Sequence, residues 1–306
     1  MILTRKSPKN VSTFHLKGAI NTSLINVWRN KNPDSETLNA IVESHNIDNF
    51  KKLEFGYNIE PSLRSMTFYH NLHAYIIALN ATNAVDLCFL YSPYFQIPSF
   101  CEYLYANGAN ISSRNPDDCS TLDIAILADH AEIASFLFSK GIEIDEKAFY
   151  YAVSSNSTVM VELLVSHGAD VNFRENNTGF SMLHIACLNC NIKVVEILIS
   201  HGININDNED VRGFTPLVIA SMMHYKEIAE FLLSHGASTN IQDKNGKMAI
   251  HHAIVPDCQG FTEFITNKIE YLNFHSRYQP SLPIVENFSD MIVLLLSNGA
   301  DVNAKK

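Results

Sequence analysis

The sequence predicts an all-α fold, a solenoid of stacked helix pairs with short β-hairpin fingers between consecutive pairs. The main observation is a marker, Gly-Ala-Asp-Val-Asn, which begins at Gly168 and returns in altered form at Gly202 and Gly236, at equal intervals. A second marker, at Ser181 and Thr215, keeps the same interval. Two markers in one phase indicate a structural unit, and repeated units of this kind bury their apolar faces by stacking on each other.

Each unit is expected to contain two helices followed by a finger. The Ser or Thr that opens the second marker is a good N-cap, and Pro216 suits the first turn of a helix. A second, apolar helix follows, for example from Val194 to Ile199. It ends at the marker glycine, which adopts the left-handed conformation at little cost. The residues from that glycine to the next cap form the finger.

The second marker carries a resemblance to a known family. Residues 181–186 and 215–220 match the pattern T-P-L-H-x-A, which is typical of ankyrin repeats. The chain in this respect resembles ankyrin-repeat proteins, which implies an ankyrin-repeat solenoid that acts as a non-catalytic protein–protein interaction scaffold or adaptor. Ahead of the repeats, Tyr91-Ser92-Pro93 and Ile97-Pro98-Ser99 resemble the uncharacterised helical segment that precedes the repeats of many protist ankyrin proteins.

Three parts are expected along the chain. Residues 1–33 contain six basic residues and no acid, which predicts a mobile basic tail, with an organelle targeting peptide as the alternative. Residues 34–107 are expected to form a helical N-terminal cap with degenerate repeats, and residues 108–306 the ankyrin repeats. An insertion is expected at about 254–288, where an eroded repeat is the alternative.

One unit of the repeat is short. Gly141 and Gly168 are closer together than the other marker glycines of the repeat, yet both helices of that unit remain recognisable. The missing residues therefore come from the finger, and we expect a gap in the row of fingers near residue 145. In the preceding unit Asp123 replaces the usual histidine of the second marker.

Composition excludes several classes of function. The chain has 306 residues, is 46% hydrophobic, and carries a formal net charge of −10, which disfavours nucleic acid and anionic membranes as partners. Its longest strongly apolar run, residues 291–296, is far too short to span a membrane, and no secretory leader is evident. Six scattered cysteines fit a reducing compartment. We therefore expect a cytoplasmic protein.

No motif for catalysis, a metal or a cofactor stands out. Cys187 and Cys190 are spaced as in metal or redox sites, but no second pair accompanies them, so structural thiols are the better interpretation. His167, His201 and His235 each precede a marker glycine, where a partly protonated ring favours the end of a helix. We expect no enzyme, no cofactor and no small-molecule substrate.

A protein partner is expected on the concave face and the finger tips. In ankyrin proteins these positions usually meet partners, and here they carry aromatic, Met and basic residues. The expected partner-binding residues are Phe180, Leu188, Arg212, Phe214, Met222, Met223, Lys244 and Asn245. Two rings at one finger position would form an exposed stripe, and the basic residues would select acidic side chains. The alternative is that the rings pack onto neighbouring fingers as core.

Two other functions remain open. The resemblance implies that the asparagine closing the first marker, at Asn172, Asn206, Asn240 and Asn303, can be a hydroxylation substrate, although it can also be structural. An enzyme with an unrecognised N-terminal site is the other alternative.

The last helix, residues 291–296, has Val293 where other units have Glu. We expect residues 254–288 or a second subunit to cover it, giving a monomer or a weak dimer, and deletion of residues 258–286 to cause aggregation.

Overall fold

The computed structural model describes residues 60–68, 71–254 and 288–301. The chain divides into two compact units, residues 1–83 and 84–306. The basic tail, most of the insertion and Asn303 lie outside the described residues, so the expectations for them stay predictions. In the first unit, helices α3 (Glu60–Phe68) and α4 (Leu72–Thr82) pack together through buried Leu63, Met66 and Tyr75.

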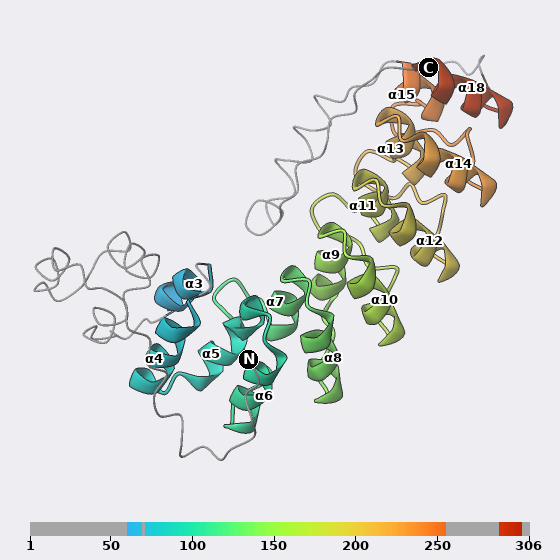
Figure 1. Ribbon diagram of the computed structural model, residues 1–306. Coiled ribbons are helices and arrows are strands. Elements are labelled where there is room, and N and C mark those ends of the chain that lie inside the picture. Colours follow the sequence, from blue (N-terminus) through green and yellow to red (C-terminus); the bar gives the residue numbers. More distant parts are fainter. Residues whose placement is uncertain (1–59, 69–70, 255–287, 302–306) are drawn as a thin grey trace, which may run out of the picture. The chain divides into compact units, whose positions relative to one another are not determined.

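The second unit is a stack of helix pairs (Figure 1). Its elements are α5 (Val85–Tyr91), η2 (Ser92–Phe95), α6 (Pro98–Ala106), α7 (Thr121–Leu127), α8 (Ala131–Ser139), α9 (Glu146–Ser154), α10 (Thr158–Ser166), α11 (Met182–Leu188), α12 (Ile192–Ser200), α13 (Pro216–Met222), α14 (Lys226–Ser234), α15 (Ala249–Ile254) and α18 (Phe288–Ser297). The first helices of the pairs, α5, α7, α9, α11, α13 and α15, pack in one row, and their partners pack in a second row. The predicted solenoid of stacked helix pairs is confirmed.

The core lies between the two rows. The first helices of the central repeats are buried throughout, as in α11 from Met182 to Leu188 and α13 from Pro216 to Met222. Each second helix buries one face, for example Val194, Val195 and Leu198 in α12. A helix pair alone would leave these apolar side chains in water, so stacking supplies most of the stability of each repeat.

The second helices end in a repeated cap. In His167, His201 and His235 the ring Nδ1 lies 2.8 Å from the carbonyl oxygen four residues earlier. A carbonyl can only accept, so Nδ1–H donates a second hydrogen bond to a last-turn carbonyl that also accepts the backbone N–H of the same histidine. The predicted helix-end position of these histidines is confirmed, and each next residue is a glycine at positive φ.

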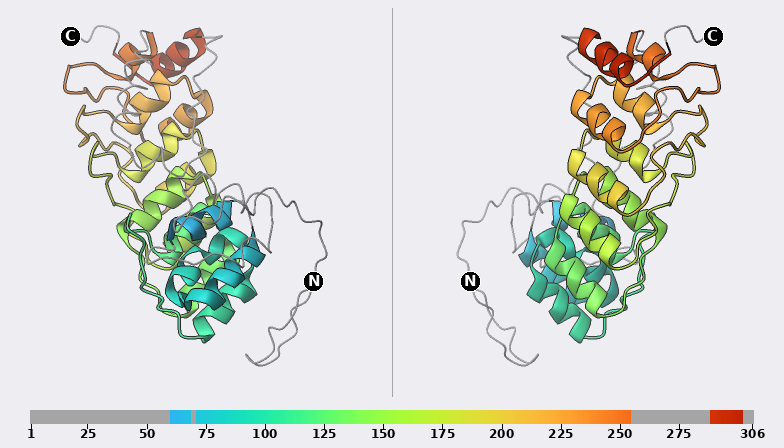
Figure 2. Two further views of the ribbon diagram at one scale, coloured as in Figure 1. Left: turned by 90° about the vertical axis from the view of Figure 1, so that its left-hand side faces the viewer. Right: turned by 90° about the vertical axis from the view of Figure 1, so that its right-hand side faces the viewer.

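The fingers lie along one side of the stack (Figure 2). They are built mainly of turns, with isolated antiparallel bridges at Arg114–Ser120 and Arg174–Ser181 among the described residues. Residues 167–181, 201–215 and 235–248 connect consecutive pairs in this way, whereas only residues 140–145 connect α8 to α9. The finger predicted to be missing near residue 145 is therefore absent, and the chain enters α9 directly.

Candidate partner-binding surface

The tips of neighbouring fingers are joined by backbone hydrogen bonds. The N–H of Val211 donates to the carbonyl of Thr178 at 3.0 Å, and the N–H of Lys244 donates to the carbonyl of Arg212 at 3.0 Å. The ammonium group of Lys244 also donates to the carbonyl of Asp210 at 2.9 Å. Because each tip is hydrogen-bonded to the next, the residues on the tips are held at defined positions relative to each other.

Each of these tips is closed by a buried acidic side chain. Asp210 accepts backbone N–H bonds from Gly213 at 2.9 Å and from Phe214 at 2.8 Å. Glu175 and Asp243 hold the same position in the adjacent fingers and also accept backbone N–H bonds. The carboxylates satisfy turn amides that would otherwise be buried without partners. Burial raises the pKa of Asp210, although these hydrogen bonds and His184 oppose the rise.

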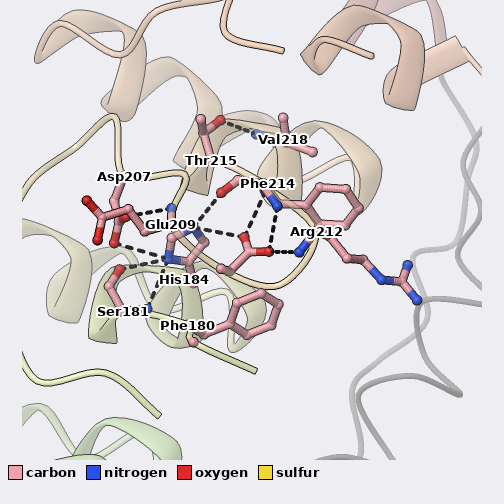
Figure 3. Close-up of polar contacts among 12 residues, drawn as sticks. Phe180, Ser181, His184, Asp207, Glu209, Arg212, Phe214, Thr215 and Val218 are labelled. Atoms are coloured by element: carbon pink, nitrogen blue, oxygen red, sulfur yellow. Dashed lines mark hydrogen bonds and ion pairs between the residues drawn. The ribbon is translucent and has the colours of Figure 1, made fainter. Parts of the chain in front are cut away.

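His184 joins the first helix of one repeat to the finger of the next (Figure 3). Its Nε2–H donates to the carbonyl of Phe214 at 2.9 Å, and the hydroxyl of Ser181 lies 2.7 Å from Nδ1. Because a carbonyl can only accept, the neutral ring carries its proton on Nε2 and accepts at Nδ1. Burial lowers the pKa of His184, against the opposing effect of Asp210 and Asp207. The ring is therefore a neutral structural link between repeats.

An ion pair strengthens the same link. The guanidinium of Arg174 contacts both carboxylate oxygens of Asp207, at 2.8 and 2.9 Å, and reaches Glu209 at 3.2 Å. Burial by itself would raise the pKa of Asp207, but the hydrogen bond from Arg174 and a backbone N–H hold it below its usual value. This forked pair fixes finger 201–215 to finger 167–181.

The aromatic and Met members of the predicted surface are buried. Phe180, Leu188, Phe214, Met222 and Met223 are between 0% and 4% exposed. The ring of Phe180 stacks on His184 with centroids 5.3 Å apart, and Phe214 meets His252 edge-on at 5.1 Å. The expected exposed stripe is therefore wrong, since these rings pack onto the helices beneath the fingers. The alternative of rings as core is the correct one.

The polar members of the predicted surface lie at the tips. Lys244 and Asn245 are exposed, and Arg212 is half-buried with its guanidinium 5.7 Å from the centre of the Phe214 ring. Figure 3 shows the side chain of Arg212 pointing away from the buried polar network. Beside it Val211 is 49% exposed. Partner binding by Arg212, Lys244 and Asn245 stays a prediction.

The sequence interpretation did not identify the polar network under the tips. The sequence did contain a pattern that indicates this network. His184 occupies the His position of the second marker, and Asp210 and Asp243 are separated by nearly one repeat interval. In the following repeat His252 of α15 contacts Asp243 through Nε2 at 2.9 Å. This contact extends the network to the last described finger.

The marker asparagines have structural roles in two repeats. The amide of Asn206 donates to the carbonyl of Gly236 at 3.1 Å, and that of Asn240 donates to the carbonyl of Gly299 at 3.0 Å. The oxygen of Asn240 also accepts from the N–H of Asp301 at 2.9 Å. The structural alternative is confirmed at these two positions, and hydroxylation stays a prediction.

Other kinds of site find little support in the described ranges. There, no three His, Cys, Asp or Glu side chains come together in a way that could hold a metal ion. Within the same ranges no helix is long and apolar enough to cross a membrane. Cys187 is buried and Cys190 is exposed, and both are free thiols.

Comparison with protein families identifies the repeats. A family model for ankyrin repeats (3 copies) matches residues 145–209 and 204–273, and a model for a domain of unknown function (DUF3447) matches residues 20–78. Residues 145–273 are therefore ankyrin repeats, and the expected uncharacterised segment ahead of the repeats is present at residues 20–78. Residues 91–99, on which the resemblance rested, lie outside that match.

Solved structures share the fold at low sequence identity. The ankyrin repeat domain of human ASB11 superimposes with a TM-score of 0.53 and 19% identity, over 71% of this chain and 86% of that one. An ankyrin repeat domain from Acinetobacter baumannii AYE superimposes with a TM-score of 0.54 and 20% identity, over 71% of this chain and 98% of that one. The ankyrin repeat domain of Bcl-3, described as a unique member of the IkappaB protein family, superimposes with a TM-score of 0.51 and 18% identity, over 70% of this chain and 92% of that one. The ankyrin-repeat fold is thus established.

One curated relative is similar in sequence. The chain is 34% identical over 85 residues to protein phosphatase 1 regulatory subunit 27 of Mus musculus, which is 26% of this chain and 54% of that protein. The chain thus spans about half the length of this relative. Together with the repeats, the similarity supports a role in protein interaction.

Proposed function

We propose that this protein is a non-catalytic interaction scaffold whose protein partner binds the exposed tips of the fingers 201–215 and 235–248. The observation that supports this most is the grouping of Val211, Arg212 and Lys244 on two tips that are hydrogen-bonded to each other. Side chains held in place before binding lose less entropy when the partner arrives. The buried network of His184 and Asp210 supplies that rigidity from below.

The chemistry of the tips favours a partner with an acidic side chain next to an apolar one. Arg212 and Lys244 carry positive charge, and the carboxylates of Asp210 and Asp243 are turned inward to backbone amides. Val211 offers an exposed apolar surface beside the two basic residues. Charge complementarity of this kind selects partners and speeds association more than it adds affinity.

The relative's description supplies a first partner to test. A regulatory subunit of protein phosphatase 1 acts on a phosphatase, so the catalytic subunit of protein phosphatase 1 belongs in the first binding assay. Any other captured protein enters the same assay as a purified component.

The test reverses the charges at the tips. Arg212→Glu and Lys244→Glu should each weaken recovery of the partner by about tenfold, because each places a negative charge against an acidic partner. Lys193→Glu is the matched control, since Lys193 is a lysine on α12, in the other row of helices.

Thermal melting checks that the variants remain folded. Arg212→Glu and Lys193→Glu should melt like the unmodified protein, whereas Lys244→Glu should melt slightly lower, because it loses the bond from its ammonium group to the carbonyl of Asp210. Unchanged partner recovery in the double variant Arg212→Glu/Lys244→Glu would refute the proposed surface.

A further inference from the structure

A buried carboxylate occupies the joint where the finger is missing. Asp123, in the first turn of α7, is fully buried. Its Oδ2 accepts from the backbone N–H of Ser120 at 2.7 Å and from the hydroxyl of Ser120 at 2.8 Å. Among the described residues, no donor reaches its Oδ1. A buried carboxylate oxygen without a hydrogen bond disfavours the ionised form of the side chain.

The same position carries a histidine in a later repeat, and the comparison explains the difference. His184 donates to the carbonyl of Phe214, which lies in the finger just before α13. The pair that follows Asp123 has no finger, because residues 140–145 lead straight into α9. In place of a finger it presents Asp145, the N-cap of α9. The backbone carbonyl that His184 meets is therefore replaced at this joint by a second carboxylate.

Ion pairs hold this joint in place of finger contacts. Arg114 of the preceding finger contacts Asp145 at 2.9 Å, and Lys147 contacts Asp118 at 2.5 Å. All four side chains are partly exposed, and pairs of this kind contribute little to stability.

Because no finger precedes α9, the backbone hydrogen bonds that join the tips of the later fingers cannot form at this joint. Across the same joint the hydroxyl of Ser157 donates to Asp129, and the rings of Phe138 and His167 stack. The joint therefore differs from the later ones in lacking tip-to-tip backbone bonds.

The charges around Asp123 act in opposite directions. Burial raises the pKa of Asp123 to about 6, and the negative charge of Asp145 adds to this, while the bonds from Ser120 and the charge of Arg114 oppose it. The other elements packed on α7 carry few charged groups. These are Asp86 on α5, Glu132 on α8, and Glu146 and Lys147 on α9, while η2 has no Asp, Glu, Lys, Arg or His.

We propose that the joint between the pairs α7–α8 and α9–α10 is a pH-sensitive hinge of the solenoid, closed when Asp123 is protonated and opening more often when it is ionised. The sign follows from linkage. An acid whose pKa is raised in the folded state stabilises that state fully at pH values below its unfolded pKa, and this stabilisation is lost as the pH rises through the folded value. The hinge therefore loosens between about pH 4 and pH 6.

Cysteine reactivity can report on this joint directly. Cys119 is buried, and its sulfur lies 3.9 Å from the hydroxyl of Tyr151 in α9, so the contact crosses the joint. Cys187 is buried in α11, away from the joint, and serves as an internal control. The full chain is labelled at several pH values with dithiodipyridine, which reacts with thiols in acid, and the rate at each cysteine is followed by peptide mass spectrometry. The ratio of the Cys119 rate to the Cys187 rate cancels the general effect of pH on thiols. The charge of ionised Asp123 also raises the pKa of Cys119, which slows that thiol and so works against the expected rise.

The ratio should rise by about twentyfold from pH 4.5 to pH 7, as ionisation of Asp123 favours opening. Asp123→Asn should abolish the rise, because the amide has no charge to gain. Asp145→Asn keeps a good N-cap and should move the end of the rise to lower pH, since the neighbouring negative charge is gone. A ratio that does not change with pH, or that changes equally in Asp123→Asn, would overturn the hinge. So would equal acceleration at both cysteines, which reports global unfolding.

Discussion

Replacing Gly213 with alanine should separate the tips of two fingers, and the size of the effect follows from the structure. Gly213 has φ +74°, and a Cβ added there would lie 3.0 Å from the backbone N and 3.1 Å from Cγ of Lys244. Gly202 has a similar φ of +81° with nothing within 4 Å of an added Cβ. The two glycines share the cost of a left-handed backbone but differ in the space around them. Gly202→Ala is thus a matched control.

The left-handed conformation should cost each alanine variant about 1–2 kcal/mol. In Gly213→Ala the contact with Lys244 must also be relieved, which adds about 1–3 kcal/mol of overpacking strain. Part of that cost is the loss of the hydrogen bond from the N–H of Lys244 to the carbonyl of Arg212, which contributes about 1 kcal/mol. The expected order of unfolding free energy, from highest to lowest, is unmodified protein, then Gly202→Ala, then Gly213→Ala.

Urea unfolding followed by circular dichroism measures the three free energies, and partner recovery gives an independent second readout. Gly213→Ala should weaken partner binding, because Arg212 and Lys244 no longer keep their relative positions, whereas Gly202→Ala should leave binding intact. Equal destabilisation by the two substitutions would refute the reasoning. It would mean that the close approach of the two finger tips contributes nothing to stability.

Two further substitutions test the local conformation and the end of the stack. Cys190 has φ +54° at an exposed turn between α11 and α12, so Cys190→Gly should raise the free energy of unfolding by about 0.5–1 kcal/mol by removing left-handed strain; a lower melting temperature would contradict this. Val293 is 62% exposed on α18, at the position where α12 and α14 carry Glu196 and Glu230. Val293→Glu should therefore change stability by less than about 0.5 kcal/mol and reduce self-association in light scattering, and a larger loss of stability would show that Val293 is covered.

The stack of helix pairs could be predicted because its causes are local. The caps and the apolar faces each depend on residues within one or two turns of a helix. The constant interval between markers repeats them in phase, so they can be recognised in the sequence. The missing finger followed from the same reasoning, since the shortened interval between Gly141 and Gly168 leaves room for two helices only. The histidines before the marker glycines are a third example, because their partner is a carbonyl four residues away.

The composition of the finger surface was decided by the tertiary structure. A finger is made of turns, and turns have no period that separates an inward side from an outward side. Phe180 and Phe214 face inward because the rings of His184 and His252 lie beneath them, and His252 comes from a different repeat than Phe214. Contacts between residues of different repeats leave no pattern in a short stretch of sequence. The sequence by itself therefore determined the repeat and its caps, and only the packing of the fingers onto the helices beneath them decided which finger residues reach the surface.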